Sequence, residues 1–106
     1  MRALLVELRG MELYQAEWCP HSHRVRQRLT ELGLDFTARQ VPADPDDRQH
    51  MKERVGTTEI PVLVVDGAEP IGGDEAILEY LGRYHECSDA DQHRAKSREE
   101  VPEFAA

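Results

Sequence analysis

The apolar run Val62–Val65, followed directly by Asp66-Gly67, determines the fold class of this chain more firmly than any other segment. A continuous aliphatic run of this length predicts a buried strand, and Asp-Gly is a strong signal for a tight hairpin turn. We therefore expect an antiparallel return strand over residues 69–71. Pro70 has no backbone N–H to donate, which places that strand at the edge of a sheet.

A strand, a helix and a second strand precede this hairpin. Met11–Gln15 has the mixed apolar and aromatic character of a short strand, and Pro20 suits the first position of a helix that ends at Gly33. A further strand is expected over Phe36–Val41. Because a β-α-β unit makes a parallel crossover whereas a hairpin is antiparallel, the sheet should be mixed. The polar side chains of the first helix are expected to face water: Arg24, Arg26, Gln27, Arg28 and Glu31.

Two more helices complete the expected order. Asp44 as N-cap, Pro45 as first residue and Gly56 as C-terminal stop predict one short helix. Gly72-Gly73 predicts a tight turn, after which Asp74 would cap the last helix. Its apolar stripe consists of Ala76, Ile77, Tyr80, Leu81 and Tyr84. The order βαβαββα, with a mixed four-stranded sheet covered by helices, is an α/β architecture of the thioredoxin-like class.

Length and composition favour a single folded domain. A chain of 106 residues with 40% apolar residues can bury one hydrophobic core, but it is too short for two ordinary domains. We expect an N-terminal extension over residues 1–10 and the folded domain over residues 11–84. Residues 85–106 are expected to form a polar tail, either flexible or a loosely docked helix.

Charge and apolar patterning exclude two kinds of partner. The formal net charge of −8 argues against nucleic acid, which requires clustered Lys and Arg. The apolar stretch at residues 3–6 is too short for a membrane span or a secretion signal. We expect a cytoplasmic monomer with no membrane partner.

The two cysteines, Cys19 and Cys87, are too few for the disulfide framework of a small secreted protein, so redox or catalytic use is favoured. Cys19 lies at the start of the first helix, where unpaired N–H groups and the positive end of the helix dipole favour a thiolate. His21 and Arg24 could add positive charge. The alternative is a buried, inert cysteine.

Ser22 stands three residues after Cys19, where the second thiol of a C-x-x-C motif would be. A disulfide within the motif is therefore impossible, and a reacted Cys19 must form a mixed disulfide. A small thiol, a partner protein or Cys87 could reduce this mixed disulfide. The alternative for Cys87 is an incidental cysteine of the tail. No metal site is expected, because Cys19, His21 and His23 do not share one helix face and no second cluster supplies ligands.

Three landmarks together resemble the glutaredoxin family over about residues 11–84. They are Trp18-Cys19-Pro20-His21-Ser22 at a strand-to-helix turn, Ile60-Pro61 before a hydrophobic strand, and Gly72-Gly73-Asp74 before the last helix. The resemblance implies a cis Pro61 that sets the backbone of Ile60 beside Cys19, to pair with the cysteinyl part of glutathione or a similar γ-glutamyl thiol. Backbone N–H groups at Gly73 and Asp74 would hold the γ-glutamyl carboxylate, and the Asp74 side chain its ammonium.

The resemblance also implies the activity: a thiol–disulfide oxidoreductase that reduces mixed disulfides between proteins and a small thiol through Cys19 alone. No tightly bound cofactor is expected, since glutathione or a related thiol is a co-substrate. Trp18 would shape the site. Three alternatives stay open: iron–sulfur cluster transfer, a non-catalytic binding module, and a protein like the N-terminal domains of glutathione S-transferases, which residues 75–81 also resemble.

Overall fold

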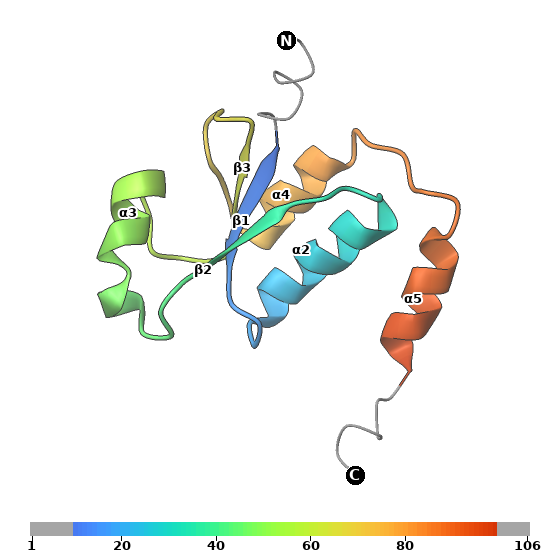
Figure 1. Cartoon of the computed structure of the whole chain (residues 1–106), viewed down its shortest axis with the longest axis horizontal. Helices are drawn as coiled ribbons and strands as arrows, with labels where there is room; N and C mark the ends of the chain where they lie inside the picture. The colour runs from blue at the N-terminus through green and yellow to red at the C-terminus, as the bar shows by residue number, and fades with distance from the viewer. Residues whose placement is uncertain (1–9, 100–106) are drawn as a thin grey trace.

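Four strands form one mixed sheet in the computed structural model, which describes residues 10–99 (Figure 1). The strands are β1 (Met11–Gln15), β2 (Thr37–Gln40), β3 (Val62–Val65) and β4 (Ile71–Gly72), in the order β2-β1-β3-β4 across the sheet. β1 is parallel to β2 and antiparallel to β3, and β3 is antiparallel to β4. The mixed sheet is therefore confirmed. Residues 1–9 of the expected N-terminal extension lie outside the described part.

Helices cover both faces of this sheet. They are α2 (Pro20–Glu31), α3 (Gln49–Val55), α4 (Asp74–Leu81) and α5 (Ala90–Arg98). Successive residues of a strand point to opposite faces, so Leu13 and its cross-strand partner Leu63 pack with α2 and α4, whereas Tyr14 and Val62 pack with Met51 of α3. The expected βαβαββα order is present, with α5 added after it.

The helix expected from Pro45 to Gly56 is two elements. A 3₁₀ turn, η1 (Pro45–Asp47), is capped by the Asp44 carboxylate, and α3 begins only after Arg48. Arg48 is buried with φ −97° and ψ 36°, outside the helical range. Its guanidinium donates to the carbonyls of Pro42, Ala43 and Thr58 at 2.7–3.0 Å. These contacts interrupt the helix, while Gly56 ends it as expected, with φ 85°.

The hairpin turn forms, but the return strand starts later than expected. Asp66 and Gly67 have φ of 54° and 77°, and the Ala68 N–H donates to the Val65 carbonyl at 2.9 Å. That is the geometry of a two-residue turn with left-handed residues. The return strand is Ile71–Gly72 rather than residues 69–71, because Pro70 offers no N–H for pairing.

The start of α4 also differs from the expectation. Gly73, with φ 93°, is the N-cap, so Asp74 is the first helical residue and does not cap the helix. Only glycine adopts this φ without strain. Along the expected stripe Ile77 is buried, whereas Ala76 is exposed and Tyr84 lies beyond the helix end.

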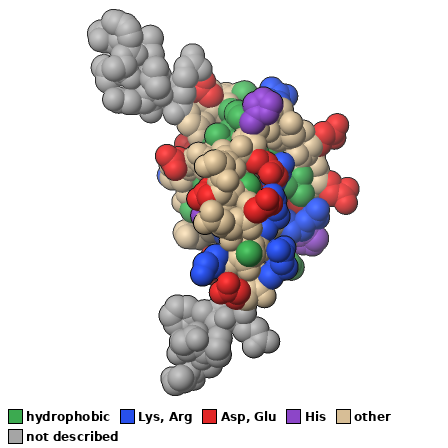
Figure 2. Space-filling view, turned by 90° about the vertical axis from the view of Figure 1, so that its right-hand side faces the viewer, with side chains coloured by type: hydrophobic (Ala, Val, Ile, Leu, Met, Phe, Trp, Pro, Cys, Tyr) green, Lys and Arg blue, Asp and Glu red, His purple; other side chains and the backbone are tan. Residues whose placement is uncertain are grey.

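Within residues 85–106, the nine residues of α5 form a helix that packs against α2 (Figure 1). An ion pair joins the two: the Glu31 carboxylate of α2, expected to face water, is buried and lies 3.0 Å from Arg94 of α5, as well as 2.7 Å from Arg28 of its own helix. Arg94 also contacts Glu86 at 2.9 Å. Figure 2, which views the side where α5 lies, shows acidic and basic side chains intermixed. This part of the segment is thus a docked polar helix.

Candidate functional site

Strand register brings the three landmark segments to one end of the sheet. Tyr14 of β1 pairs with Val62 of β3, and Val62 pairs with Gly72 of β4. Each segment lies next to one of these three paired residues: the loop to Cys19 follows β1, Ile60-Pro61 precedes β3, and Gly73-Asp74 follows β4.

Cys19 is the N-cap of α2, and Pro20 is the first residue of that helix, as expected. The backbone of Cys19 is extended, with φ −82° and ψ 118°, which aims its side chain back at the helix end. The Ser22 N–H donates to its sulfur at 3.4 Å. The sulfur therefore lies where the first turn of α2 offers amide hydrogens that no carbonyl accepts.

The pKa of the Cys19 thiol is lowered from its ordinary value. Burial raises it, since the side chain is largely shielded from water. That effect is outweighed by hydrogen bonds from the Ser22 hydroxyl and from the backbone N–H groups of Ser22 and His21, together with the positive charge of Arg26. The nucleophilic thiolate is thus favoured at the sheet end.

Ser22 is fully buried and joins the helix to the loop before it. Its hydroxyl accepts a hydrogen bond from the Ala16 N–H at 3.4 Å and also bonds the sulfur of Cys19. A hydroxyl donates to a thiolate but forms no disulfide with it. Ser22 therefore stabilises the charged sulfur without offering a second thiol.

The side chains of His21 and Arg24, whose directions the sequence left open, contact Asp74. His21 Nδ1 lies 3.0 Å and Arg24 Nη1 2.7 Å from the same oxygen, Asp74 Oδ2. The hydrogen bond to His21 is the main cause that lowers the pKa of the Asp74 carboxyl, followed in the same direction by Arg24. Asp74 thus ties the start of α4 to the start of α2.

The peptide bond between Ile60 and Pro61 is cis, as the resemblance implied. The Pro61 carbonyl accepts a hydrogen bond from the Gly73 N–H at 2.9 Å, which connects this loop to the cap of α4. Because the Gly73 amide is already engaged, it is not available for the carboxylate that the resemblance assigned to it. Ile60 is half-buried beside Val62 and the α3 layer.

Trp18 is the large hydrophobic side chain most open to solvent among the described residues, with 64% of its surface exposed. It directly precedes buried Cys19. An exposed indole beside a shielded sulfur offers apolar contact area to a molecule that approaches the thiol.

Arg26 belongs to this site although we expected it to face water. Its guanidinium donates to the Gln15 side chain and to the carbonyls of Ala16 and Glu17, the latter two at 3.3 Å each. Seven residues separate it from Cys19, which is two helical turns, so both lie on one face of α2. That spacing was the sequence signal available for it.

Cys87 lies at the far end of α2 from Cys19. Its N–H and its sulfur both contact the Glu31 carbonyl, at 2.9 and 3.0 Å. A 12-residue helix separates the two cysteines, about 18 Å at 1.5 Å per residue, whereas a disulfide needs Cα atoms within about 7 Å. The pKa of Cys87 is raised, mainly by its hydrogen bond to Asp89 and then by burial.

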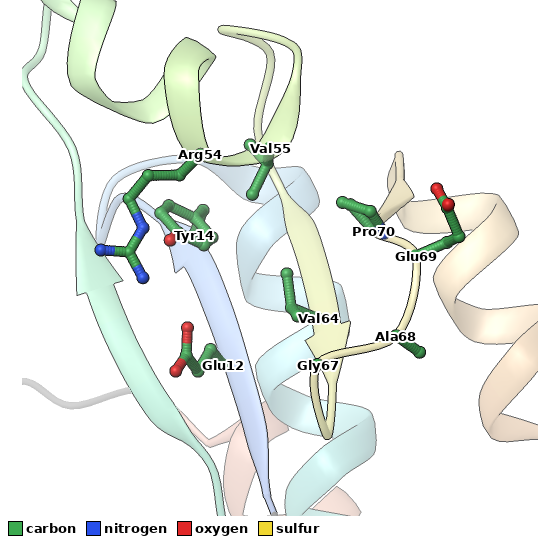
Figure 3. A pocket seen from close by; sticks show the side chains of 9 residues that line it. All are labelled: Glu12, Tyr14, Arg54, Val55, Val64, Gly67, Ala68, Glu69 and Pro70. Carbon is green, nitrogen blue, oxygen red and sulfur yellow. The ribbon is translucent and has the colours of Figure 1, made fainter.

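A groove on the α3 side of the sheet holds none of the landmark residues (Figure 3). Arg54 and Val55 of α3, strand residues and the loop after β3 line it, and the Glu12 carboxylate inside it accepts a hydrogen bond from Arg39 at 3.1 Å. Nowhere in residues 10–99 do three His, Cys, Asp or Glu side chains gather as metal ligands would.

Comparison with known proteins gives consistent results. The family model described as glutaredoxin matches residues 11–69. Glutaredoxin 3 of Escherichia coli is 33% identical over 64 residues, which are 60% of this chain and 76% of that protein.

Two solved structures represent the neighbours of this fold. A buckwheat glutaredoxin–glutathione complex has a TM-score of 0.57 and 21% identity, and the match covers 77% of this chain and 76% of that one. Rice GST1 in complex with glutathione has a TM-score of 0.63 and 25% identity, and the match covers 85% of this chain but only 44% of that one. The thioredoxin-like fold class is thereby confirmed, and the chain spans less than half of the rice protein.

Proposed function

Because the chain belongs to the glutaredoxin family, and is thus a glutaredoxin-like thiol–disulfide oxidoreductase, we propose that it works through a single cysteine, Cys19. The observation that supports this most directly is the setting of its sulfur at the start of α2, where Ser22 and two amides lower its pKa. Ser22 supplies no second thiol, and Cys87 is a helix length away.

The proposed reaction has two exchanges. The Cys19 thiolate attacks the small-thiol sulfur of a protein mixed disulfide, so that the disulfide breaks, the protein leaves as thiolate, and a Cys19–small-thiol disulfide forms. A second small thiolate then attacks the small-thiol sulfur of that adduct. This step releases the small-thiol disulfide and restores the Cys19 thiolate, so that each protein thiolate set free consumes one small thiolate and converts the mixed disulfide into the small-thiol disulfide.

The proposed co-substrate is glutathione or a similar γ-glutamyl thiol, as glutathione is present in the solved complexes of the buckwheat and rice proteins. The backbone of Ile60 before Pro61 would pair with its cysteinyl part. Since the Gly73 amide bonds Pro61, the γ-glutamyl carboxylate would use the amides that follow it at the start of α4, beginning with Asp74. The ammonium would bind the Asp74 carboxylate.

The proposed clients are proteins that carry a mixed disulfide with a small thiol and that dock over the exposed indole of Trp18. We further propose that the protein acts as a cytoplasmic monomer without a tightly bound cofactor. Across residues 10–99, no helix has the length and apolar character needed to cross a bilayer.

Mass spectrometry after exposure to a small-molecule disulfide tests the proposal. The two reagents are oxidised glutathione and oxidised γ-glutamylcysteine. We expect one small-thiol adduct on Cys19, lost in Cys19→Ser and retained in the matched control Cys87→Ser. The same pattern should hold for turnover of a glutathionylated peptide in the presence of glutathione. An adduct confined to Cys87, or turnover that survives Cys19→Ser, would contradict the assignment.

A further inference from the structure

The loop between β1 and α2 is fastened by one side chain from two turns further along the helix. Arg26 donates to the carbonyls of Ala16 and Glu17 at 3.3 Å each. The Ala16 carbonyl also accepts the N–H of Cys19 at 3.2 Å. The residues that set the direction of the Cys19 side chain are therefore bonded to the guanidinium.

A buried amide fixes the guanidinium from the side of the sheet. Gln15 is only 2% exposed, its carbonyl oxygen accepts a hydrogen bond from Arg26, and its amide nitrogen donates to the Gln40 side chain at 3.0 Å. Both ends of the Gln15 amide are thus occupied, so it cannot turn away from Arg26 without leaving a buried polar atom unpaired. The chain of contacts runs from β2 through β1 to the helix.

We propose that Arg26 is a positioning residue for the reaction of Cys19: it holds the Ala16–Glu17 backbone in place and keeps a positive charge on the loop that leads into Cys19. This inference rests on the proposed function of Cys19. The positive charge of Arg26 is among the causes that lower the pKa of Cys19, and the guanidinium is mostly shielded from solvent, which limits screening. Arginine suits this role because its planar guanidinium spreads five N–H donors over three nitrogens in a fixed fork, whereas an ammonium has three donors on a single nitrogen.

Other charges around the sulfur do not replace this one. His21 and Arg24 are engaged with Asp74. The Glu17 carboxylate lies 3.5 Å from the Arg26 guanidinium but is 87% exposed, so water screens its opposing charge. Titratable and charged side chains over residues 16–26, Cys19 apart, are Glu17, His21, His23, Arg24 and Arg26; Glu59 precedes Ile60-Pro61, and Asp74 and Glu75 begin α4.

The test is the pH dependence of iodoacetamide alkylation, followed for the Cys19 and Cys87 peptides separately by mass spectrometry. Arg26→Gln removes the charge, Arg26→Lys keeps a charge without the fork, and Arg54→Gln on α3 removes an exposed charge remote from the sulfur. At about pH 6 we expect Cys19 alkylation to be ~3- to 10-fold slower in Arg26→Gln, since the thiolate fraction changes tenfold for each unit of pKa. Arg26→Lys should fall between Arg26→Gln and the unchanged protein, and Arg54→Gln should match the latter.

Two outcomes separate this inference from the proposed function. If Cys19 in the unchanged protein titrates like an ordinary thiol, the proposed function fails. If Cys19 titrates low in the unchanged protein and equally low in Arg26→Gln, the role of Arg26 is wrong while the function stands. If circular dichroism shows that Arg26→Gln does not fold, Arg26→Lys decides. If Cys19 titrates in Arg26→Lys as it does in the unchanged protein, the role proposed for the planar guanidinium of Arg26 is wrong.

Discussion

At the scale of single residues, Ser22 offers a direct test of what holds the thiolate. Its hydroxyl is buried and bonds the Cys19 sulfur, lowering the pKa of that thiol. We expect Ser22→Ala to slow Cys19 alkylation near neutral pH by about two- to tenfold, because one hydrogen bond contributes ~0.5–1.5 kcal/mol. The control is Ser97→Ala, which removes an exposed hydroxyl on α5. Equal titration of Cys19 in both variants would count against the bond.

Arg24 provides a second prediction at this scale, because it already occupies the carboxylate proposed to bind the ammonium of the small thiol. Arg24→Gln frees Asp74 from its shorter contact, so we expect KM for the small thiol to fall by about two- to fivefold, as for loss of a competing exposed ion pair. Steady-state turnover with varied glutathione measures this change. A higher KM would mean that Arg24 itself attracts the small thiol.

Residue types and spacing predicted part of the site from the sequence. The positions of Cys19 and Pro20 at the start of the first helix could be predicted, because the signals for the end of a strand and the start of a helix lie in neighbouring residues. For Arg26 the spacing from Cys19 was the one signal named above, and it does not reveal the partners, which are backbone carbonyls of the preceding loop and a side chain of β1. Those contacts exist only after α2 packs on the sheet. The pairing of Asp74 with Arg24 likewise joins residues 50 positions apart.

At the scale of elements, α5 depends on ion pairs more than on apolar contact. Arg94 contacts both Glu31 and Glu86, and Ala90 is the one buried side chain assigned to α5 in the described structure. We expect Arg94→Ala to speed hydrogen exchange of the α5 amides by about two- to tenfold, with little change in β1. Arg98→Ala, at the exposed end of α5, is the control. Unchanged exchange would show that other contacts hold the helix.

The same ion pairs predict how docking depends on pH. Hydrogen bonds from Arg94 and then Arg28 lower the pKa of Glu86 from 4.5 to about 2. A lowered folded-state pKa stabilises the folded form above the unfolded value, and this contribution is lost as pH falls from about 4.5 to about 2. The protection factors of the α5 amides, which correct for the slower intrinsic exchange in acid, should therefore fall over that range in the unchanged protein. In Glu86→Gln this fall should be smaller, which hydrogen exchange at several pH values measures.

Local signals located most elements but not their edges. β1 and β3 appear where expected, because alternating and continuous apolar runs report burial directly. The break between η1 and α3 comes from the buried contacts of Arg48 with a loop ten residues later, which no local pattern contains. The turn before β4 was predicted correctly. β4 itself begins later than expected, because Pro70 has no N–H with which to pair across the sheet.

At the scale of the whole molecule, the layer that the sheet forms with α2 and α4 contains the larger of the two clusters of buried apolar side chains. Leu13 lies at its centre with no exposed surface. We expect Leu13→Ala to lower the free energy of unfolding by about 2–5 kcal/mol, since the cavity adds to the lost transfer free energy. Val64→Ala, at a half-buried position on the other face, should cost about 1 kcal/mol. Urea unfolding compares them, and equal losses would contradict this account of the core.

The exposed indole beside the buried sulfur gives the protein its own optical signal. Trp18 is the one tryptophan among 106 residues, so all indole emission from the molecule originates next to Cys19. A disulfide formed on that sulfur adds a quencher on the residue next to the ring. Each turnover at the thiol can therefore be followed as a change in intrinsic fluorescence, without a label and without altering the chain.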